Sequence, residues 1–126
     1  MKHLILALVI LGLLLAFSAG SVIQVSDIAN HTTTLLRQAQ EQERAGRSQA
    51  ARQTLSEAVH YWNSKETFLC IVLRHEQVDT VTETLAKLNA YANSEDQDDF
   101  YSTCAELLEE LNHLSQMELP LPKNIL

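Results

Sequence analysis

The side chains best suited to chemistry gather at His75, Glu76 and Asp79. His75 and Asp79 are four residues apart, so on a continuous helix they would share one face. An imidazole and a carboxylate placed in this way could supply two ligands to a divalent metal, whereas a closed structural zinc site needs four. Further ligands would have to come from elsewhere in the chain, and the candidates are His60, Glu83 and His113.

The same three residues also suit a junction between two helices. The carboxylates of Glu76 and Asp79 would favour the start of a helix near 77–93, and the imidazole of His75 would favour the end of the helix before it. Because nothing in the pattern requires a metal here, we predict no metal and no cofactor. We treat these three residues, together with Trp62, as candidate interaction or structural residues.

Cys70 and Cys104 are the only cysteines in the chain. Outside the cytoplasm they could form a disulfide across 34 residues, worth about 3–4 kcal/mol in the chain-entropy model. Alternatively, because both lie on or beside apolar stripes, they could be unpaired thiols that act as small buried hydrophobic groups. A cysteine–histidine hydrolase would also need an oxyanion hole, and the chain has no glycine-rich or nucleophile-elbow motif. We therefore predict no catalytic residues and no enzyme activity.

The N-terminal segment indicates where these residues lie in the cell. Residues 4–23 contain no charged side chain, and 16 of these 20 residues are apolar. Twenty helical residues extend about 30 Å, which matches the hydrocarbon thickness of a bilayer. We therefore predict that the chain contacts the membrane through residues 4–23. Lys2 is the only lysine or arginine before Arg37, which favours an N-terminus inside and the remaining chain outside.

Two interpretations of residues 1–23 remain open, a retained anchor and a cleaved signal peptide. Lys2 and the apolar run 4–17 have the character of a signal peptide, and small residues follow at cleavage spacing. Apolar side chains return at Val22 and Ile23, however, which favours the anchor. The expected location is the cell membrane, with a single pass and an extracytoplasmic C-terminal domain, and the alternative is secretion.

The rest of the chain has the pattern of an all-α domain. Between residues 24 and 119 there is one glycine, Gly46, and no proline, whereas strand-rich domains need frequent turn residues. Apolar side chains recur every three or four residues, as on one face of a helix. The four stripes are Val25, Ile28, Leu35, Leu36, Ala39; Leu55, Val59, Trp62, Leu69; Val78, Val81, Leu85, Leu88, Ala92; and Phe100, Cys104, Leu107, Leu111, Leu114.

These stripes predict a small antiparallel helical bundle that continues directly from the N-terminal transmembrane helix. Its helices are expected near 24–45, 48–74, 77–93 and 97–116. The predicted domain organisation is an anchor or signal peptide at 1–23, a helical domain at 24–119 and an extended tail at 120–126, where Pro120 and Pro122 oppose helix.

The expected helix ends differ in how clearly they are marked. Gly46 suits the left-handed residue that ends a helix, and Ser48 suits the N-cap of the next. Residues 94–97 form a capping-box pattern. The boundary near 74–77 has neither glycine nor proline, so a break just after Trp62 remains an alternative.

The charge of the chain excludes one large class of partners. Residues 24–126 carry 8 basic and 16 acidic side chains, a net charge of −8. Nucleic-acid binding needs clustered lysine and arginine, so we predict no nucleic-acid partner. The acidic stretches 95–99 and 106–110 are expected to be solvated helix faces, because a calcium loop would need a glycine and a regular acid spacing.

A resemblance to a known family rests on Trp62, the string His75-Glu76-Gln77-Val78-Asp79 and the terminal Asn124-Ile125-Leu126. The chain resembles, over essentially its whole length, a family of small proteins from Gram-positive bacteria that is catalogued as a domain of unknown function. Its members combine a short basic start, an apolar segment and a helical region with a His-Glu-x-hydrophobic-Asp junction and an Asn-Ile-Leu-like end. The resemblance implies no particular activity. It implies a retained anchor, an extracytoplasmic helical domain and, because some members are encoded beside a multispanning membrane protein, a membrane protein partner.

Together these observations predict a non-enzymatic, membrane-anchored, extracytoplasmic helical domain that docks a membrane or envelope protein. One alternative is a metal- or ligand-binding sensor domain built on His75, Glu76 and Asp79. Another is a helical bundle secreted after cleavage near residue 19 or 21. The pattern does not indicate any particular small molecule.

Overall fold

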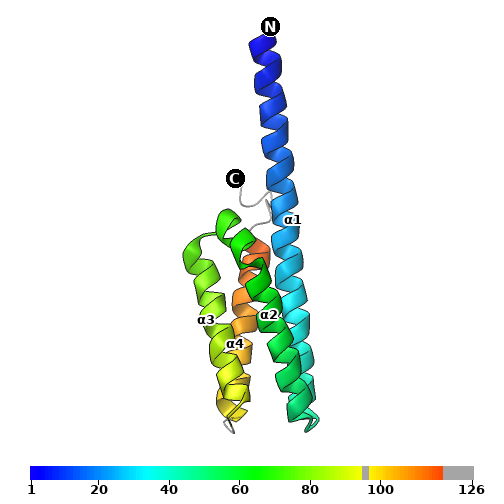
Figure 1. The fold of residues 1–126 in the computed structure, drawn as a ribbon, viewed down its shortest axis with the longest axis vertical. Helices are drawn as coiled ribbons and strands as arrows, with labels where there is room; N and C mark the ends of the chain where they lie inside the picture. Colours follow the sequence, from blue (N-terminus) through cyan, green and yellow to red (C-terminus); the bar gives the residue numbers. More distant parts are fainter. Residues whose placement is uncertain (95–96, 118–126) are drawn as a thin grey trace.

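The computed structural model of the protein describes residues 1–94 and 97–117. Within these ranges the chain folds into four α-helices and no strand (Figure 1). The helices are α1 (Lys2–Arg44), α2 (Ser48–Val72), α3 (His75–Ala92) and α4 (Gln97–Met117). This confirms the predicted all-α class and the predicted order of helices.

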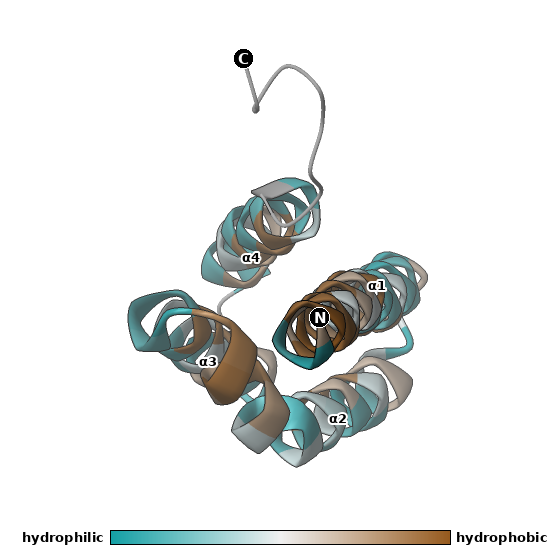
Figure 2. Cartoon of the chain, turned by 90° about the horizontal axis from the view of Figure 1, so that it is seen from above, coloured by the Kyte–Doolittle hydropathy of each residue, from teal (hydrophilic) through white to brown (hydrophobic). Residues whose placement is uncertain are grey.

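The helices form an antiparallel ring in which each one packs against two neighbours. α1 packs against α2 and α4, and α3 packs against the same two helices from the opposite side, so α1 lies diagonally across from α3 (Figure 2). The connections are short, and successive helices therefore run in opposite directions (Figure 1). This arrangement is the up-down-up-down four-helix bundle, with α1 extended far beyond it at the N-terminal end.

The turn between α1 and α2 depends on Gly46, which has φ +79°. The Gly46 N–H donates to the carbonyl of Glu43 at 3.1 Å, and the Arg47 N–H donates to the carbonyl of Gln42 at 2.8 Å. These two bonds form a Schellman motif, which ends a helix with a left-handed residue. Arg47 is also the N-cap of α2, and its carbonyl accepts the first helical bond, from the Ala51 N–H at 3.0 Å. The predicted N-cap Ser48 is therefore wrong, since Ser48 is already the first residue of the helix.

The turn between α2 and α3 consists of two extended residues, Leu73 (φ −118°, ψ 166°) and Arg74 (φ −68°, ψ 139°). α2 continues unbroken past Trp62, so the alternative break after that residue is wrong. His75 opens α3 and does not end α2, which corrects the boundary expected at 74–77. The turn lacks glycine and proline and is held instead by the side chain of Leu73, which is buried in the core.

Two further expectations lie outside the described residues, wholly or in part. The capping-box pattern at 94–97 includes residues 95–96, and the tail 120–126 lies beyond the end of α4.

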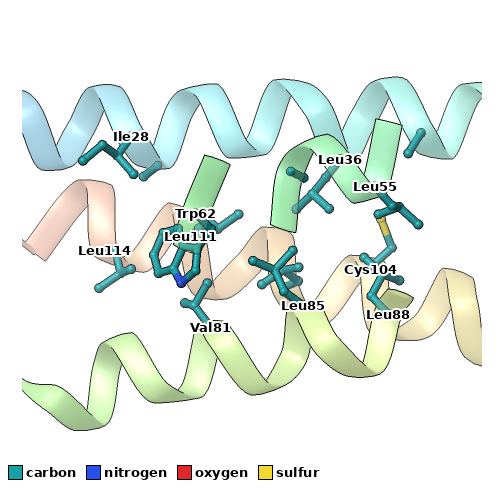
Figure 3. Close-up of a cluster of buried hydrophobic side chains, with 14 of the residues drawn as sticks. Ile28, Leu36, Leu55, Trp62, Val81, Leu85, Leu88, Cys104, Leu111 and Leu114 are labelled. Atoms are coloured by element: carbon teal, nitrogen blue, oxygen red, sulfur yellow. The ribbon is translucent and has the colours of Figure 1, made fainter. Parts of the chain in front are cut away.

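The core fills the space between the helices with one apolar stripe from each (Figure 3). Trp62, Val81 and Leu114 gather toward one end of this core, and Leu55, Leu88 and Cys104 toward the other. Burying a large side chain of this kind stabilises the fold by about 1.5–3 kcal/mol. The predicted stripes are confirmed at every position except Leu35, Val59 and Ala92, which are half-buried and pack against the core.

Four threonines also lie in the core, at positions that continue the apolar stripes: Thr32, Thr54, Thr84 and Thr103. The hydroxyls of Thr32, Thr54 and Thr84 donate to the carbonyl four residues earlier, at 2.8, 3.0 and 2.8 Å. This bond removes the cost of burying the hydroxyl, so threonine packs here like a β-branched apolar residue.

α1 has two parts that are both helical but differ in how far their side chains are buried. The apolar side chains of residues 4–17 and Ile23 are exposed, and burial begins at Val25. α1 is the one helix of the described chain that is long and apolar enough to cross a membrane. The boundary between anchor and bundle is thus a change of surroundings along one continuous helix of 43 residues.

Candidate functional site

The residues singled out at the α2–α3 junction all lie on the surface. His75, Glu76 and Asp79 occupy the first turns of α3, and their side chains are exposed. Across the described ranges, no group of three or more His, Cys, Asp or Glu side chains is placed to hold a metal ion. The junction therefore brings the three predicted residues near one another without gathering a further ligand around them.

The two cysteines are free thiols in the structure. Cys104 is buried between α1 and α3 on the side of the bundle where Leu55 and Leu88 lie, whereas Cys70 is half-buried near the end of α2 (Figure 3). α2 and α4 lie diagonally across the bundle from each other. At about 1.5 Å per residue, the two cysteines also lie about 20 Å apart along the bundle axis. A disulfide needs Cα atoms within about 7 Å, so the two thiols do not pair in this arrangement.

Trp62 joins two helices from inside the core. Its side chain is only 1% exposed, and its indole Nε1 donates a hydrogen bond of 2.9 Å to Thr82 Oγ1 on α3. The Thr82 hydroxyl donates in turn to the carbonyl of Val78 at 2.9 Å. The structure thus places Trp62 in a packing position, where a partner protein cannot reach it.

A groove lies between α3 and α4. It has a volume of about 170 Å³ and a mostly apolar lining. α3 contributes Gln77, Thr80 and Val81, and α4 contributes Glu110, His113 and Leu114. We call it the α3–α4 groove. Its α3 residues lie in the first two turns after the α2–α3 turn, which puts the groove in the half of the bundle nearest the apolar segment of α1 (Figure 1).

Glu110 carries the unusual chemistry of this groove. Its Oε1 lies 3.3 Å from the Thr84 hydroxyl, which shares its single proton between this oxygen and the nearer carbonyl of Thr80. Its Oε2 is buried and has no hydrogen-bond partner among the described residues. Burial raises the pKa of Glu110, and the nearby Glu106 carboxylate raises it further, while the Thr84 bond and Lys87 oppose the rise. A buried carboxylate oxygen without a donor is costly, so this atom either takes a proton or accepts a bond from outside.

The predicted solvated face at 106–110 is therefore correct only in part. Glu106 and Glu109 are exposed, but Glu110 is half-buried against α3. Helical periodicity places Glu110 three residues from Leu107 and one from Leu111, at the edge of the apolar stripe, and that position was the only available signal. Whether such an edge residue is buried depends on how closely α3 packs against α4. The apolar periodicity of α4 alone gives no information about that distance.

A second hollow lies between α1 and α2. It has a volume of about 400 Å³ and includes Asp27, Tyr61 and Lys65 in its lining. The rings of His31 and Tyr61 are 4.2 Å apart, and Lys65 Nζ lies 5.7 Å from the Tyr61 ring centroid. Burial raises the pKa of Tyr61, and the Asp27 carboxylate adds to the rise. Both signs of charge line this hollow, so its electrostatics favour no single class of ligand.

Comparison with known families places the chain in one of them. Residues 20–125 match the family described as Domain of unknown function (DUF4363). The chain belongs to this family. The match covers the bundle, including the α3–α4 groove and the α2–α3 junction, and it begins near the end of the apolar segment. The resemblance to a family of unknown function is therefore confirmed, while a Gram-positive source and the junction and tail motifs remain predictions.

Membership of DUF4363 carries no activity to this chain. No curated protein shows significant similarity to it. No solved structure does either. The functional argument therefore depends on the geometry of this bundle.

Proposed function

We propose that this DUF4363 protein is a non-enzymatic, membrane-anchored helical domain that docks a membrane or envelope protein outside the cytoplasm. The docking surface in this proposal is the α3–α4 groove. The observation that carries it is the buried Oε2 of Glu110, which lines an apolar groove and lacks a donor among the described residues.

The membrane anchor is supported by the exposed apolar part of α1. The apolar side chains of residues 4–17 are exposed and do not pack against the bundle. Exposing so much apolar surface to water would be unfavourable. A bilayer removes this cost, and about 20 residues suffice to cross it. The helix does not break between the apolar segment and the bundle, which supports a retained anchor over cleavage near residue 19 or 21.

The charge distribution supports an extracytoplasmic bundle. Lys2 precedes the apolar segment, and no lysine or arginine follows the segment before Arg37. Flanking lysine and arginine residues favour the cytoplasmic side. The proposal therefore places Lys2 inside and the bundle outside.

The partner in this proposal presents an apolar segment that carries a lysine or arginine. The apolar side chains would fill the α3–α4 groove, in the manner of a helix or extended segment laid between two helices. The cation would donate to Oε2 of Glu110, next to the exposed carboxylates of Glu106 and Glu109. A hydrogen bond of this kind is charge-assisted and therefore stronger than one between neutral groups.

The position of the groove favours a partner that is itself in the membrane. Val81 lies six residues from the start of α3, so the groove extends to about 10 Å from the α2–α3 turn at 1.5 Å per residue. A short extracytoplasmic loop of a membrane protein could reach a surface at this height.

Site-specific photo-crosslinking in native membranes would test the docking proposal. A photoreactive amino acid at Thr80, which is exposed and lines the groove, should yield an adduct with one integral membrane protein. The same amino acid at Gln53, an exposed residue of α2, is the control and should yield none. The adduct from position 80 should fall strongly when Glu110→Ala is added, and the peptide it contains should carry a lysine or arginine.

Three outcomes would contradict the docking proposal. They are equal labelling from positions 80 and 53, an adduct that is insensitive to Glu110→Ala, and an adduct with a second copy of this chain.

A further inference from the structure

Ile71 is a large apolar side chain that is exposed although it lies outside the apolar segment of α1. Among the described residues, the other exposed large hydrophobic side chains all lie between residues 1 and 23. Ile71 is 72% exposed and lies on the last turn of α2, one residue before its end. A single exposed isoleucine is common in soluble proteins, so its significance depends on where it lies.

The α2–α3 turn lies beside the end of the apolar segment. A hollow of about 210 Å³ is lined on one side by Ile71 and Val72 of α2. Its other wall is formed by α1, from Phe17 to Val25. In Figure 1 the upper end of α2 reaches the level at which α1 leaves the bundle toward the N-terminus. Seen from that end in Figure 2, hydrophobic colour covers the N-terminal part of α1 and also the stretch that leads from α2 into α3.

The depth of this turn follows from the rise of an α-helix. If residues 4–23 fill the hydrocarbon core, Phe17 lies about 9 Å inside its outer boundary and Val22 lies about 2 Å inside it, at 1.5 Å per residue. Ile71 shares the hollow with both residues, so it lies at the level of the outer hydrocarbon boundary. Apolar groups of peripheral helices enter membranes to a similar depth, about 5–10 Å.

The polar neighbours of Ile71 suit the same boundary. Arg74 and His75 follow it and are exposed, and Glu66 and Glu76 lie nearby on α2 and α3. Because both signs of charge surround the turn, its membrane contact depends on the apolar side chain and not on anionic lipid. The long side chain of Arg74 can extend to phosphate groups while its methylene groups remain near the acyl chains.

We infer that residues 71–75 form a second membrane contact, with Ile71 inserted into the outer leaflet of the bilayer that residues 4–23 cross. This inference rests on the proposed membrane span. A helix that crosses a bilayer alone can rotate and tilt, whereas a second contact restricts both motions. The contact would therefore orient the bundle on the membrane and hold the α3–α4 groove at a constant height.

Depth-dependent fluorescence quenching tests this contact. The full-length protein, with Cys70 and Cys104 replaced by alanine, is reconstituted into phosphatidylcholine vesicles that contain nitroxide-labelled lipids. An environment-sensitive fluorophore is attached after Ile71→Cys, Leu11→Cys or Gln53→Cys. Leu11 marks the middle of the apolar segment, and Gln53 marks the exposed surface at the far end of α2.

The expected result is that the label at position 71 emits at shorter wavelength than the label at 53. It should also be quenched more by a shallow nitroxide than by a deep one, and the label at 11 should show the opposite preference. If label 71 behaves like label 53 while label 11 lies in lipid, the second contact is wrong and the anchor stands. If labels 11 and 71 both remain in water, the membrane span itself fails. Circular dichroism of each variant, which should match the unmodified chain, verifies that the bundle is folded.

Discussion

The indole Nε1 of Trp62 donates a 2.9 Å hydrogen bond to Thr82 Oγ1, and this bond joins α2 to α3 inside the bundle. The other neighbouring pairs are joined in the same way. The Thr54 hydroxyl shares its proton between its own helix and Gln42 Oε1 of α1. The Thr84 hydroxyl does the same with Glu110 Oε1 of α4, and Ser26 of α1 approaches Ser115 of α4. Each of these bonds requires one rotation of a helix about its axis. Together they select one packing of stripes that are otherwise alike.

Thr82→Val should therefore destabilise the bundle although valine keeps the shape of threonine. The substitution leaves a buried indole N–H without an acceptor, which costs about 1–3 kcal/mol. The matched control is Thr80→Val, because the Thr80 hydroxyl also donates to a carbonyl four residues earlier but its side chain is exposed. The free energy of unfolding in detergent micelles should fall for the first variant and change little for the second. Equal effects of the two substitutions would mean that the indole bond contributes nothing.

The pairing of Trp62 with Thr82 also shows where sequence reasoning stops. The burial of Trp62 was predictable from the sequence, because it follows from the apolar periodicity of a single helix. The identity of its partner depends on how α2 and α3 are rotated and shifted relative to each other, and neither period contains that information. Glu110 was misread for the same reason, because α3 covers it. The end of α2 was misplaced because a buried Leu73 forms the turn without glycine or proline.

Glu110→Gln should stabilise the protein more at neutral than at acidic pH. The pKa of Glu110 is raised in the folded state, so its charged form opposes folding. Its contribution to stability is greatest below the ordinary pKa of 4.5 and is lost as pH rises through the higher folded pKa. Glutamine has no charge to bury and keeps an oxygen for the Thr84 hydroxyl. Unfolding measured at pH 4 and pH 7.5 should show the larger gain at pH 7.5.

The control for this pH dependence is Glu109→Gln, which removes an exposed acid from the same stretch of α4. Its effect on the free energy of unfolding should be small at both pH values. A gain for Glu110→Gln that stays constant between pH 4 and pH 7.5 would contradict the buried environment assigned to this side chain.

Gly46→Ala should destabilise the turn between α1 and α2 by about 1–2 kcal/mol, the cost of a left-handed conformation for a residue with a Cβ atom. The structure predicts a purely conformational cost, because an added Cβ atom would meet no atom within 4 Å. Gly46→Asn should lose less, since asparagine adopts this conformation more readily. Thermal unfolding of the two variants should separate them, and an alanine variant as stable as the original chain would argue against the Schellman turn.

Cys70 and Cys104 should differ in reactivity and should not be linked. Burial raises the pKa of the Cys104 thiol to about 11, so little thiolate is available for alkylation, whereas Cys70 is half-buried. Mass spectrometry should find one rapid modification in the folded protein and two after unfolding without reductant. If the unfolded protein takes up no label without reductant, the two cysteines are joined by a disulfide, which would contradict the free thiols of this structure.

Accessibility of cysteines in intact cells tests the central claim most directly, namely that residues 4–23 anchor a bundle outside the membrane. A membrane-impermeant maleimide is applied to Gln53→Cys and His3→Cys variants of a chain whose native cysteines are alanine, so that Lys2 is kept in both. We expect full-length protein in the carbonate-washed membrane fraction, with position 53 labelled at once and position 3 labelled only after permeabilisation. A soluble protein that begins near residue 19 or 21, or a protected position 53, would contradict this claim.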